Sequence, residues 1–359
     1  MIDYLTDKYF RVEKRVKKLF LWFSLVHSRH TAHQDRKKII RRKGKSVVTR
    51  EVKKTIKQYA RERFGSGSYW PYLAYYAEIR GQFMEGWIPD DYFTHVLEPK
   101  INPRIYGNIS GIKTYDHRLF GDFAIRPLLL VISGLFYDAD LNVLDENQLN
   151  LILSDHNDDV VLKEEFGFGG KQVRMMHSSE FTPKVLNKGM NYVIQPYFRQ
   201  HKILSDLYPH SVNTFRVTTL LKKDGSVDVK FVILRFGVDG KRVDNLSSGG
   251  QCIYIYPEGK PDRIAYDYLS IPMGETHQNT GFRFSDLEIP MYWEILESCR
   301  TAHKKFPYVR VIGWDVCVDE QGKPKLLEWN GYHATYAIED ALFGPFSTND
   351  PEFSVKRES

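Results

Sequence analysis

The sequence predicts an α+β protein that begins with a basic, helical N-terminal arm. Apolar residues follow helical spacing in the first 64 positions, whereas segments 212–236 and 311–330 alternate like β-hairpins around polar turns. A further strand pair, 160–163 and 172–176, flanks a glycine-rich turn. Helices and antiparallel hairpins that occupy separate parts of one chain are typical of the α+β class.

Length and composition narrow the class of protein. A chain of 359 residues is long enough for two or three domains, and 42% hydrophobic with 14% aromatic residues excludes global disorder. The three cysteines show neither disulfide nor zinc spacing, which predicts a reducing compartment and hence a cytoplasmic protein. The apolar run Leu19 to Val26 is shorter than the roughly 20 residues that span a bilayer, and no signal-peptide cleavage site follows it.

The positive charge is concentrated at the N-terminus. Residues 1–64 hold 20 Lys+Arg against 6 Asp+Glu, a balance of +14, so the remainder carries −8. Two helical patterns, 1–26 and 48–64, flank the polar, basic segment 27–46. The arm fits a helix pair packed on the body, or docking to an anionic inner membrane face or an acidic glycan. Nucleic acid is not expected, because no recognition motif appears.

Composition shifts predict the organisation of the chain. We expect a basic helical arm over 1–64, an N-terminal lobe over 65–140, a lid subdomain over 141–198 and a C-terminal catalytic lobe over 199–359. Within them, 145–154 and 291–306 are expected as helices, 97–110 as a loop and 126–136 as one bent strand. The strand 192–198 is expected to end, or to form the edge of, its sheet, because Pro196 cannot donate to a ladder.

The hairpin 311–330 carries the most informative side chains. With Gln321 and Gly322 as turn residues, Asp315 lies opposite Glu328. The same register sets Cys317 opposite Leu326. Side chains alternate along a strand, so two faces follow. One face is polar, with Asp315, Glu328 and Asn330, and the other is apolar, with Trp314, Val316, Leu327 and Trp329.

The polar face of this hairpin predicts a cation site. Opposed carboxylates lie roughly 5 Å apart at Cβ and repel each other. Two carboxylates and an amide oxygen are hard ligands that suit Mg²⁺. The alternative is an acidic pair on a solvated face.

The hairpin 212–236 carries a pair of arginines. Its turn, Asp224-Gly225, is a strong type I′ signal, and the register sets Arg216 opposite Ile233 and Thr214 opposite Arg235. Arg216 and Arg235 are then diagonal neighbours. Because guanidinium binds carboxylate and phosphate bidentately, the pair indicates an anion site. The alternative is two surface arginines.

The glycine-rich turn follows a lysine in an apolar strand. Lys163 ends the strand, and the turn contains Gly167, Gly169, Gly170 and Lys171. Such a turn lets backbone N–H groups approach phosphate oxygens, and a buried ammonium requires an anionic partner. The alternative is a glycine turn that only reverses the chain.

Taken together, these parts resemble the ATP-grasp superfamily, and within it the sugar-transfer-associated ATP-grasp group, a relative of the glutamate-ligase-like enzymes. The resemblance spans roughly residues 110 to 335 and leaves residues 1–64 outside. Five blocks carry it: VLKEEFGFGGKQV (161–173), YVIQPYFRQHKIL (192–204), SVNTFRVTTL (211–220), the ILRFG, VDN and GG run (233–250), and GWDVCVDEQGKPKLLEWN (313–330).

The resemblance implies an ATP-grasp fold in which two antiparallel sheets clamp the nucleotide. By analogy Lys163 and the glycine loop would contact ATP phosphates, and Gln195, Pro196 and Tyr197 would form the adenine hinge. Arg216, Arg235 and Asn245 would be catalytic, and Asp315, Glu328 and Asn330 would hold Mg²⁺. The usual upstream phosphate-binding lysine is missing, because the chain has Tyr115-Asp116-His117-Arg118 at that place. Either Arg118 or Lys113 would replace it, or the affinity for nucleotide would be weak.

The implied activity is that of an ATP-dependent carboxylate–amine ligase. The expected substrates are a uronic-acid-containing glycan or sugar nucleotide, of a surface polysaccharide or its precursor, and an amino acid or amine. Two alternatives remain at this point. One is a ligase that adds amino acids to a peptide or protein, and the other is a weakly active nucleotide-binding scaffold in polysaccharide assembly.

Overall fold

The computed structural model describes residues 2–166, 173–332, 340–342 and 344–345. By compactness the chain divides into two units. The first comprises Met1–Ile101, Leu269–Ile271 and Thr335–Ser359, and the second comprises Asn102–Tyr268 and Pro272–Ala334. The four domain limits expected from the sequence stay a prediction.

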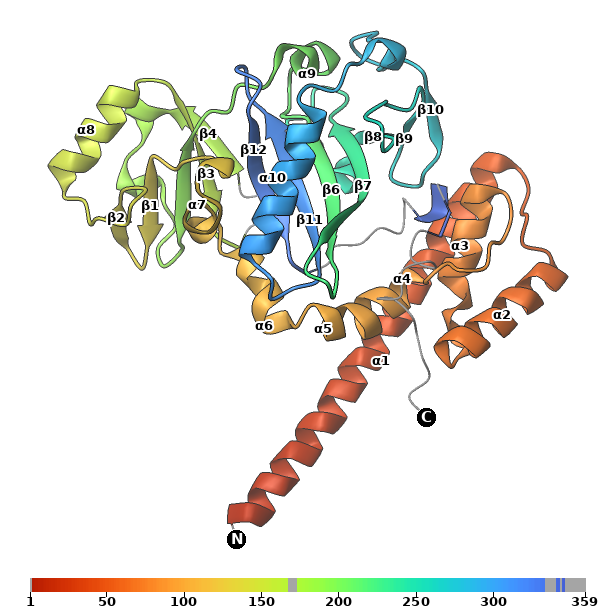
Figure 1. The fold of residues 1–359 in the computed structure, drawn as a ribbon. Helices are drawn as coiled ribbons and strands as arrows, with labels where there is room; N and C mark the ends of the chain where they lie inside the picture. The colour runs from red at the N-terminus through yellow and green to blue at the C-terminus, as the bar shows by residue number, and fades with distance from the viewer. Residues whose placement is uncertain (1, 167–172, 333–339, 343, 346–359) are drawn as a thin grey trace. The chain divides into compact units, whose positions relative to one another are not determined.

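The first unit is built from helices (Figure 1). They are α1 (Ile2–Lys43), α2 (Arg50–Phe64), α3 (Trp70–Arg80), α4 (Asp90–Tyr92) and α5 (Glu98–Ile101). The polar segment 27–46, expected to separate two helices, is instead helical as far as Lys43. Among the described residues, no helix is apolar over a length that would cross a bilayer.

A buried carboxylate explains why this polar segment is helical. Glu78 on α3 is 1% exposed, and Arg36 of α1 donates to its Oε1 from Nε and Nη2 at 2.9 and 2.8 Å. Lys43 donates to the carbonyls of Glu78 and Ile79 at the end of α3. The basic residues of α1 therefore satisfy buried acceptors, and the helix continues because its polar side has these partners.

The second unit contains two antiparallel sheets. The smaller sheet has the order β2-β1-β5-β3-β4 and the larger sheet β10-β9-β8-β7-β6-β11-β12. Strands of the smaller sheet are β1 (Leu129–Ile132), β2 (Leu135–Tyr137), β3 (Asp159–Glu164), β4 (Val173–His177) and β5 (Tyr192–Pro196). Those of the larger sheet are β6 (Thr214–Leu221), β7 (Val227–Phe236), β8 (Gln251–Tyr254), β9 (Ala265–Tyr266), β10 (Pro272–Gly274), β11 (Val311–Val318) and β12 (Pro324–Asn330).

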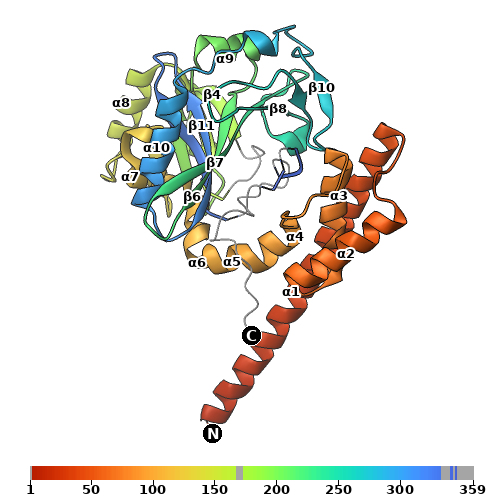
Figure 2. The same cartoon turned by 45° about the vertical axis from the view of Figure 1, so that its right-hand side comes forward.

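A long helix packs on each sheet and contributes to its core (Figures 1 and 2). α8 packs Leu149 and Leu153 against the smaller sheet, and α10 packs residues such as Ile295 and Cys299 against the larger one, where Trp314 is fully buried. The helices of this unit are α6 (Arg104–Gly107), α7 (Asp116–Phe120), α8 (Glu146–His156), α9 (Lys202–Leu207) and α10 (Tyr292–Lys305). The predicted helices 145–154 and 291–306 are confirmed.

Three expectations about local structure are wrong. β5 does end at Pro196, but it lies in the middle of its sheet, between β1 and β3, and not at an edge. A proline at the last position of a strand leaves the other backbone hydrogen bonds of that strand intact. Pro196 can therefore end a central strand, and its presence does not require an edge strand. The segment 126–136 forms two paired strands, with Ser133 at φ 52° between them. The segment expected as a loop, 97–110, contains α5 and α6.

The β11–β12 hairpin keeps the central predicted pair through two compensating irregularities. The Asp319 N–H donates to the Lys323 carbonyl, so the turn is Glu320–Gly322 and not two residues long. Cys317 consequently pairs with Lys325, so its predicted pairing with Leu326 is wrong. A bulge next to Asp315 then restores the register, and Asp315 pairs with Glu328 as predicted.

The bulge also changes which leucine enters the core. Leu326 is 2% exposed and belongs to the core of the larger sheet. Leu327, which strict alternation assigns to the core, lines a cavity instead. Trp314 and Trp329 stack in the core with ring centroids 6.1 Å apart, as their alternation predicts.

A chain of hydrogen bonds fixes the buried side of β11. Trp314 Nε1 donates to Thr219 Oγ1 at 2.8 Å, and Thr219 Oγ1 lies 2.7 Å from His303 Nδ1. His303 Nε2 is 3.1 Å from the Val309 carbonyl, which can only accept. The proton of the neutral imidazole is therefore on Nε2, and Nδ1 accepts from Thr219.

Acid is expected to destabilise this core through His303. Burial lowers the pKa of His303 from 6.5 to about 4, so the neutral ring stabilises the fold above pH 6.5 and this contribution is lost as the pH falls towards 4. At pH 5 the loss is about 2 kcal/mol. Urea unfolding at pH 7 and pH 5 should show a pH dependence smaller by this amount in His303→Asn. The exposed control His30→Gln should behave as wild type, and an unchanged pH dependence in His303→Asn would refute the assignment.

Candidate active site

A cavity of about 400 Å³ lies between the two sheets of the second unit. The smaller sheet contributes residues of β3, β4 and β5, and the larger sheet contributes residues of β6, β7, β11 and β12. Its volume is in the range of small-molecule sites. Eleven predicted site residues line it: Lys113, Lys163, Gln195, Pro196, Tyr197, Arg216, Arg235, Asn245, Asp315, Glu328 and Asn330.

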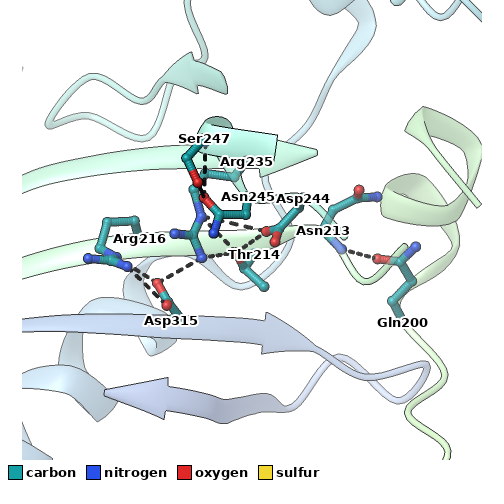
Figure 3. A network of polar contacts seen from close by, with 9 residues as sticks. All are labelled: Gln200, Asn213, Thr214, Arg216, Arg235, Asp244, Asn245, Ser247 and Asp315. Carbon is teal, nitrogen blue, oxygen red and sulfur yellow. Dashed lines mark hydrogen bonds and ion pairs between the residues drawn. The ribbon is translucent and has the colours of Figure 1, made fainter. Parts of the chain in front are cut away.

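The two predicted arginines meet on one carboxylate (Figure 3). Arg216 donates from Nε to Asp315 Oδ1 at 2.6 Å and from Nη2 to Oδ2 at 3.0 Å. Arg235 Nη2 lies 3.0 Å from Asp315 Oδ1. The side chains of the three residues are 18%, 13% and 7% exposed, so this is a largely buried triad.

The charges of this triad hold one another ionised. Burial alone would raise the pKa of Asp315, but Arg216 and Arg235 outweigh it and hold the pKa below its ordinary value. Burial alone would lower the pKa of Arg235, but Asp315 and Asp244 raise it above its ordinary value. A carboxylate between two guanidiniums is fixed in position as well as in charge.

Two residues that sequence reasoning missed complete the network. Arg235 donates to Thr214 Oγ1 from Nε and Nη2 at 3.1 and 2.8 Å, and Thr214 in turn donates to Asp244 Oδ2. Asp244 lies 3.6 Å from Arg235 Nε, and burial raises its pKa. The Val243-Asp244-Asn245 run marks this segment in the sequence. Because the run lies in a loop, the sequence does not indicate that Asp244 lies beside Arg235 on β7.

The three predicted metal ligands line the same cavity. Glu328 is 31% exposed at its side chain and lies 3.9 Å from Lys113 Nζ; burial raises its pKa, and Lys113 partly offsets this. Asn330 Nδ2 is 3.4 Å from the Gly313 carbonyl. Asp315 and Glu328 thus lie on one face, as the hairpin predicts, although no group of three His, Cys, Asp or Glu side chains able to hold a metal occurs among the described residues.

The predicted phosphate contacts are only partly brought together. Lys163 at the end of β3 lines the cavity, and burial lowers its pKa despite the nearby Glu328. Of the two candidates for the missing upstream lysine, Lys113 lines the cavity, whereas Arg118 is exposed and does not. Asp116 in that segment accepts from Trp329 Nε1 at 2.9 Å, so it supports the back of β12. Gly167, Gly169, Gly170 and Lys171 lie outside the described residues.

The predicted hinge presents one unused acceptor. Gln195 Nε2 donates to the Ile125 carbonyl at 3.1 Å, while its Oε1 is buried without a hydrogen-bond partner among the described residues. The Tyr197 N–H donates to the Asp159 carbonyl. Buried polar atoms are usually satisfied, so Gln195 Oε1 indicates a donor supplied by a ligand.

Asn245 is held by its own loop. Its Oδ1 accepts from the backbone N–H and the hydroxyl of Ser247, both at 3.1 Å (Figure 3). The residue lines the cavity next to Asp244. The structure therefore gives Asn245 a fixed orientation, while its predicted catalytic role stays a prediction.

Gly313 allows Arg216 to reach Asp315. A Cβ at this position would lie 2.9 Å from Arg216 Nη1, which is too close, and the guanidinium is fixed by two bonds to Asp315. Gly313→Ala is therefore expected to displace Arg216 and to lower the rate of any reaction in the cavity by about 10-fold or more. Initial-rate assays beside thermal unfolding check this. Gly225→Ala, in the distant β6–β7 turn at φ 82°, is strained in its backbone and should lower stability without lowering the rate, which separates the two effects. An unimpaired Gly313→Ala would contradict the argument.

Comparison with known proteins identifies the region that holds most of this site. Residues 184–339 match the model of the sugar-transfer-associated ATP-grasp family. They include β5 and all of the larger sheet, with Arg216, Arg235, Asp315 and Glu328. No curated protein matches the chain.

Solved structures show weak similarity to the chain. A biotin carboxylase from Campylobacter jejuni has 10% identity and a TM-score of 0.40, over 68% of this chain and 47% of its own. A carboxyaminoimidazole ribonucleotide synthase from Aspergillus clavatus has 12% identity and a TM-score of 0.40, over 71% and 55%. The N5-carboxyaminoimidazole ribonucleotide synthetase of Thermotoga maritima has 12% and 0.36, over 66% and 49%. The chain thus spans about half the length of these proteins, and at such scores they assign it no function.

The family match and the architecture agree with the resemblance that the sequence blocks carry. Two antiparallel sheets face one cavity, and the matched region supplies the larger sheet and its charged residues. Residues 184–339 are similar to the sugar-transfer-associated ATP-grasp family, and the two antiparallel sheets around one cavity agree with the ATP-grasp fold that the sequence blocks predict.

Proposed function

We propose that the chain is an ATP-dependent carboxylate–amine ligase that acts in the cavity between its two sheets. The observation that carries this proposal is the gathering of cations, two carboxylates and an orphan acceptor in one cavity. Lys113 and Lys163 line the cavity, Arg216 and Arg235 surround Asp315, and Gln195 Oε1 has no hydrogen-bond partner among the described residues.

The orphan acceptor and the lysines suit a nucleotide. The exocyclic amino group of adenine is a donor that would satisfy Gln195 Oε1, and the two ammonium groups would neutralise phosphates. Burial lowers the pKa of Lys163, and a bound phosphate would favour its charged form again. ATP is the substrate that the ATP-grasp fold suggests.

The donor set fits Mg²⁺. A carboxylate offers about four lone-pair positions, and Arg216 and Arg235 take three of those on Asp315. Asp315 Oδ2, Glu328 and Asn330 would hold the ion. When bound, Mg²⁺ would offset negative charge on the transferred phosphoryl group.

The chemistry proceeds in two steps. A carboxylate oxygen of the acceptor attacks the γ-phosphorus of ATP, and the bond between the γ-phosphorus and the bridging oxygen breaks. ADP departs, and the acceptor is now an acyl phosphate. An amine then attacks the acyl carbon, phosphate leaves, and the nitrogen loses a proton to give an amide. The protein supplies positioning and charge stabilisation: Arg216 uses two of its five N–H donors on Asp315, which leaves others for the reacting anion.

The acceptor that we propose is the uronic acid of a surface polysaccharide or of its sugar-nucleotide precursor. The name of the matched family supports it, and so does Arg242, an exposed cation that lines the cavity and can bind a carboxylate. A screen of ADP release with uronic-acid sugars, peptides and free amino acids as carboxylates, each with a set of amines, tests it. Release that needs a uronic acid supports the proposal. Release that needs a peptide would make the chain a peptide ligase, and no release above background would leave a nucleotide-binding scaffold.

A further inference from the structure

The N-terminal half of α1 carries apolar side chains that its own chain leaves exposed. Val16, Leu19, Phe23 and Val26 are 45%, 55%, 56% and 43% exposed. The second half of α1 packs on the first unit, where Ala32 is 2% exposed. Figures 1 and 2 both show α1 extending well past α2 and α3, which belong to the same unit.

These exposed residues continue a heptad repeat. Apolar residues alternate at spacings of three and four through the helix, at Ile2, Leu5, Tyr9, Val12, Val16, Leu19, Phe23 and Val26. Ile2, Tyr9, Val16 and Phe23 take position a, and Leu5, Val12, Leu19 and Val26 take position d. A seven-residue spacing kept over more than three heptads is typical of a coiled coil, because an ordinary helix drifts roughly 20° per heptad from a straight seam.

The seam ends where packing within the chain begins. The next a position is His30, and from Ser28 onwards α1 bonds to its own unit, through Ser28 to Tyr72 at 3.3 Å, Arg29 to Asp91 at 2.8 Å and Arg36 to Glu78. Arg29 and Arg36 take position g, which flanks the line of the seam, but both lie C-terminal to Val26, the last residue of the seam. A partner on the seam therefore leaves the packing of α1 on α3 unchanged.

We propose that residues 2–26 of α1 form a parallel coiled coil with the same segment of a second copy of this chain. The charges flanking the seam match this arrangement. Lys8 is at position g and Glu13 at the following e, and these positions face each other across a parallel dimer. Phe20 and Trp22, also at e and g and exposed, widen the apolar seam. An anionic membrane would attract the lysines but does not require a seven-residue spacing.

Light scattering on the full-length protein tests the dimer. Over about 1 to 50 µM the wild type should have twice the monomer mass. Leu19→Lys with Phe23→Lys should reduce it to the monomer mass, and Leu21→Lys should stay dimeric, since Leu21 is also apolar and exposed, at 39%, but lies at position f. All three side chains are exposed, so the fold should survive, as circular dichroism can verify. A monomeric wild type, or a dimer that the double variant leaves intact, would overturn the proposal.

Further measurements test the parallel orientation of the two helices and the alternative that α1 binds a membrane surface. Because Cys252, Cys299 and Cys317 are buried, Leu19→Cys adds a single accessible thiol, and a parallel dimer should oxidise to an intermolecular disulfide. Lys8→Glu should weaken the dimer, and adding Glu13→Lys should restore it. A wild type that is monomeric and co-sediments with phosphatidylglycerol vesicles would overturn the dimer in favour of a membrane surface.

Discussion

Asp315→Asn is expected to lower the free energy of unfolding by about 3–5 kcal/mol and to abolish ADP release. The substitution keeps the shape of the side chain but leaves Arg216 and Arg235 as largely buried cations without their shared carboxylate. Removing one partner of a buried ion network costs more than removing all of it, because the remaining charges stay desolvated. Urea unfolding gives the stability and a coupled assay gives the rate.

Two variants separate the structural from the chemical role of Asp315. Asp228→Asn is the matched control, because Asp228 lies on the same sheet, 3.3 and 3.6 Å from two lysines, but is 42% exposed. It should change stability by less than about 0.5 kcal/mol. The variant Asp315→Leu, Arg216→Met, Arg235→Met and Asp244→Asn, which also neutralises the acid beside Arg235, should regain stability without activity. An Asp315→Asn protein as stable as Asp228→Asn would contradict the buried-triad account.

Lys163→Met is expected to inactivate the protein while leaving it as stable as the wild type or more stable. Burial lowers the pKa of Lys163, so the fold disfavours its charge, and an apolar side chain of similar length removes that cost. The same change removes a cation that lines the cavity and that we propose to bind phosphate, so it should weaken nucleotide binding by about 100-fold. Displacement of a fluorescent nucleotide and thermal unfolding measure the two effects.

The control for this prediction is Lys222→Met. Lys222 lies 3.3 Å from Asp228 with a 33% exposed side chain and does not line the cavity. It should change neither nucleotide binding nor stability appreciably. Undiminished nucleotide binding by Lys163→Met would remove Lys163 from the site, and a marked loss of stability would make it a structural residue.

Local patterns predicted the parts of the fold that alternate or repeat over short range. The arginine hairpin keeps its predicted pairs, with Arg216 opposite Ile233 and Thr214 opposite Arg235. Its predicted type I′ turn is wrong, because the Lys222 N–H donates to the Ser226 carbonyl and the turn is three residues long, and a bulge next to Thr219 restores the register. Asp315 pairs with Glu328, but for a reason that the pattern did not contain, because a longer turn and a bulge cancel each other. Strict alternation has no means of locating a bulge, so it assigned Leu327 to the core instead of Leu326.

Contacts between distant segments could not be predicted. Asp244 reaches Thr214 across 30 positions, and nothing near either residue signals the pair. The need for glycine at position 313 follows from the packing of Arg216 against it, and the sequence around Gly313 does not indicate this contact. The two arginines bind a carboxylate of the chain itself, Asp315. A pair of guanidinium groups predicts an anion, but it does not distinguish a protein carboxylate from a ligand.

The central claim is that a carboxylate is activated by phosphoryl transfer in the cavity. Labelling both carboxylate oxygens of the acceptor with oxygen-18 and analysing the released phosphate tests it most directly. The account predicts one labelled oxygen in the phosphate for each amide formed, since an acyl phosphate passes that oxygen on when the amine displaces phosphate. Unlabelled phosphate beside amide formation, or ADP release that needs no carboxylate, would contradict it.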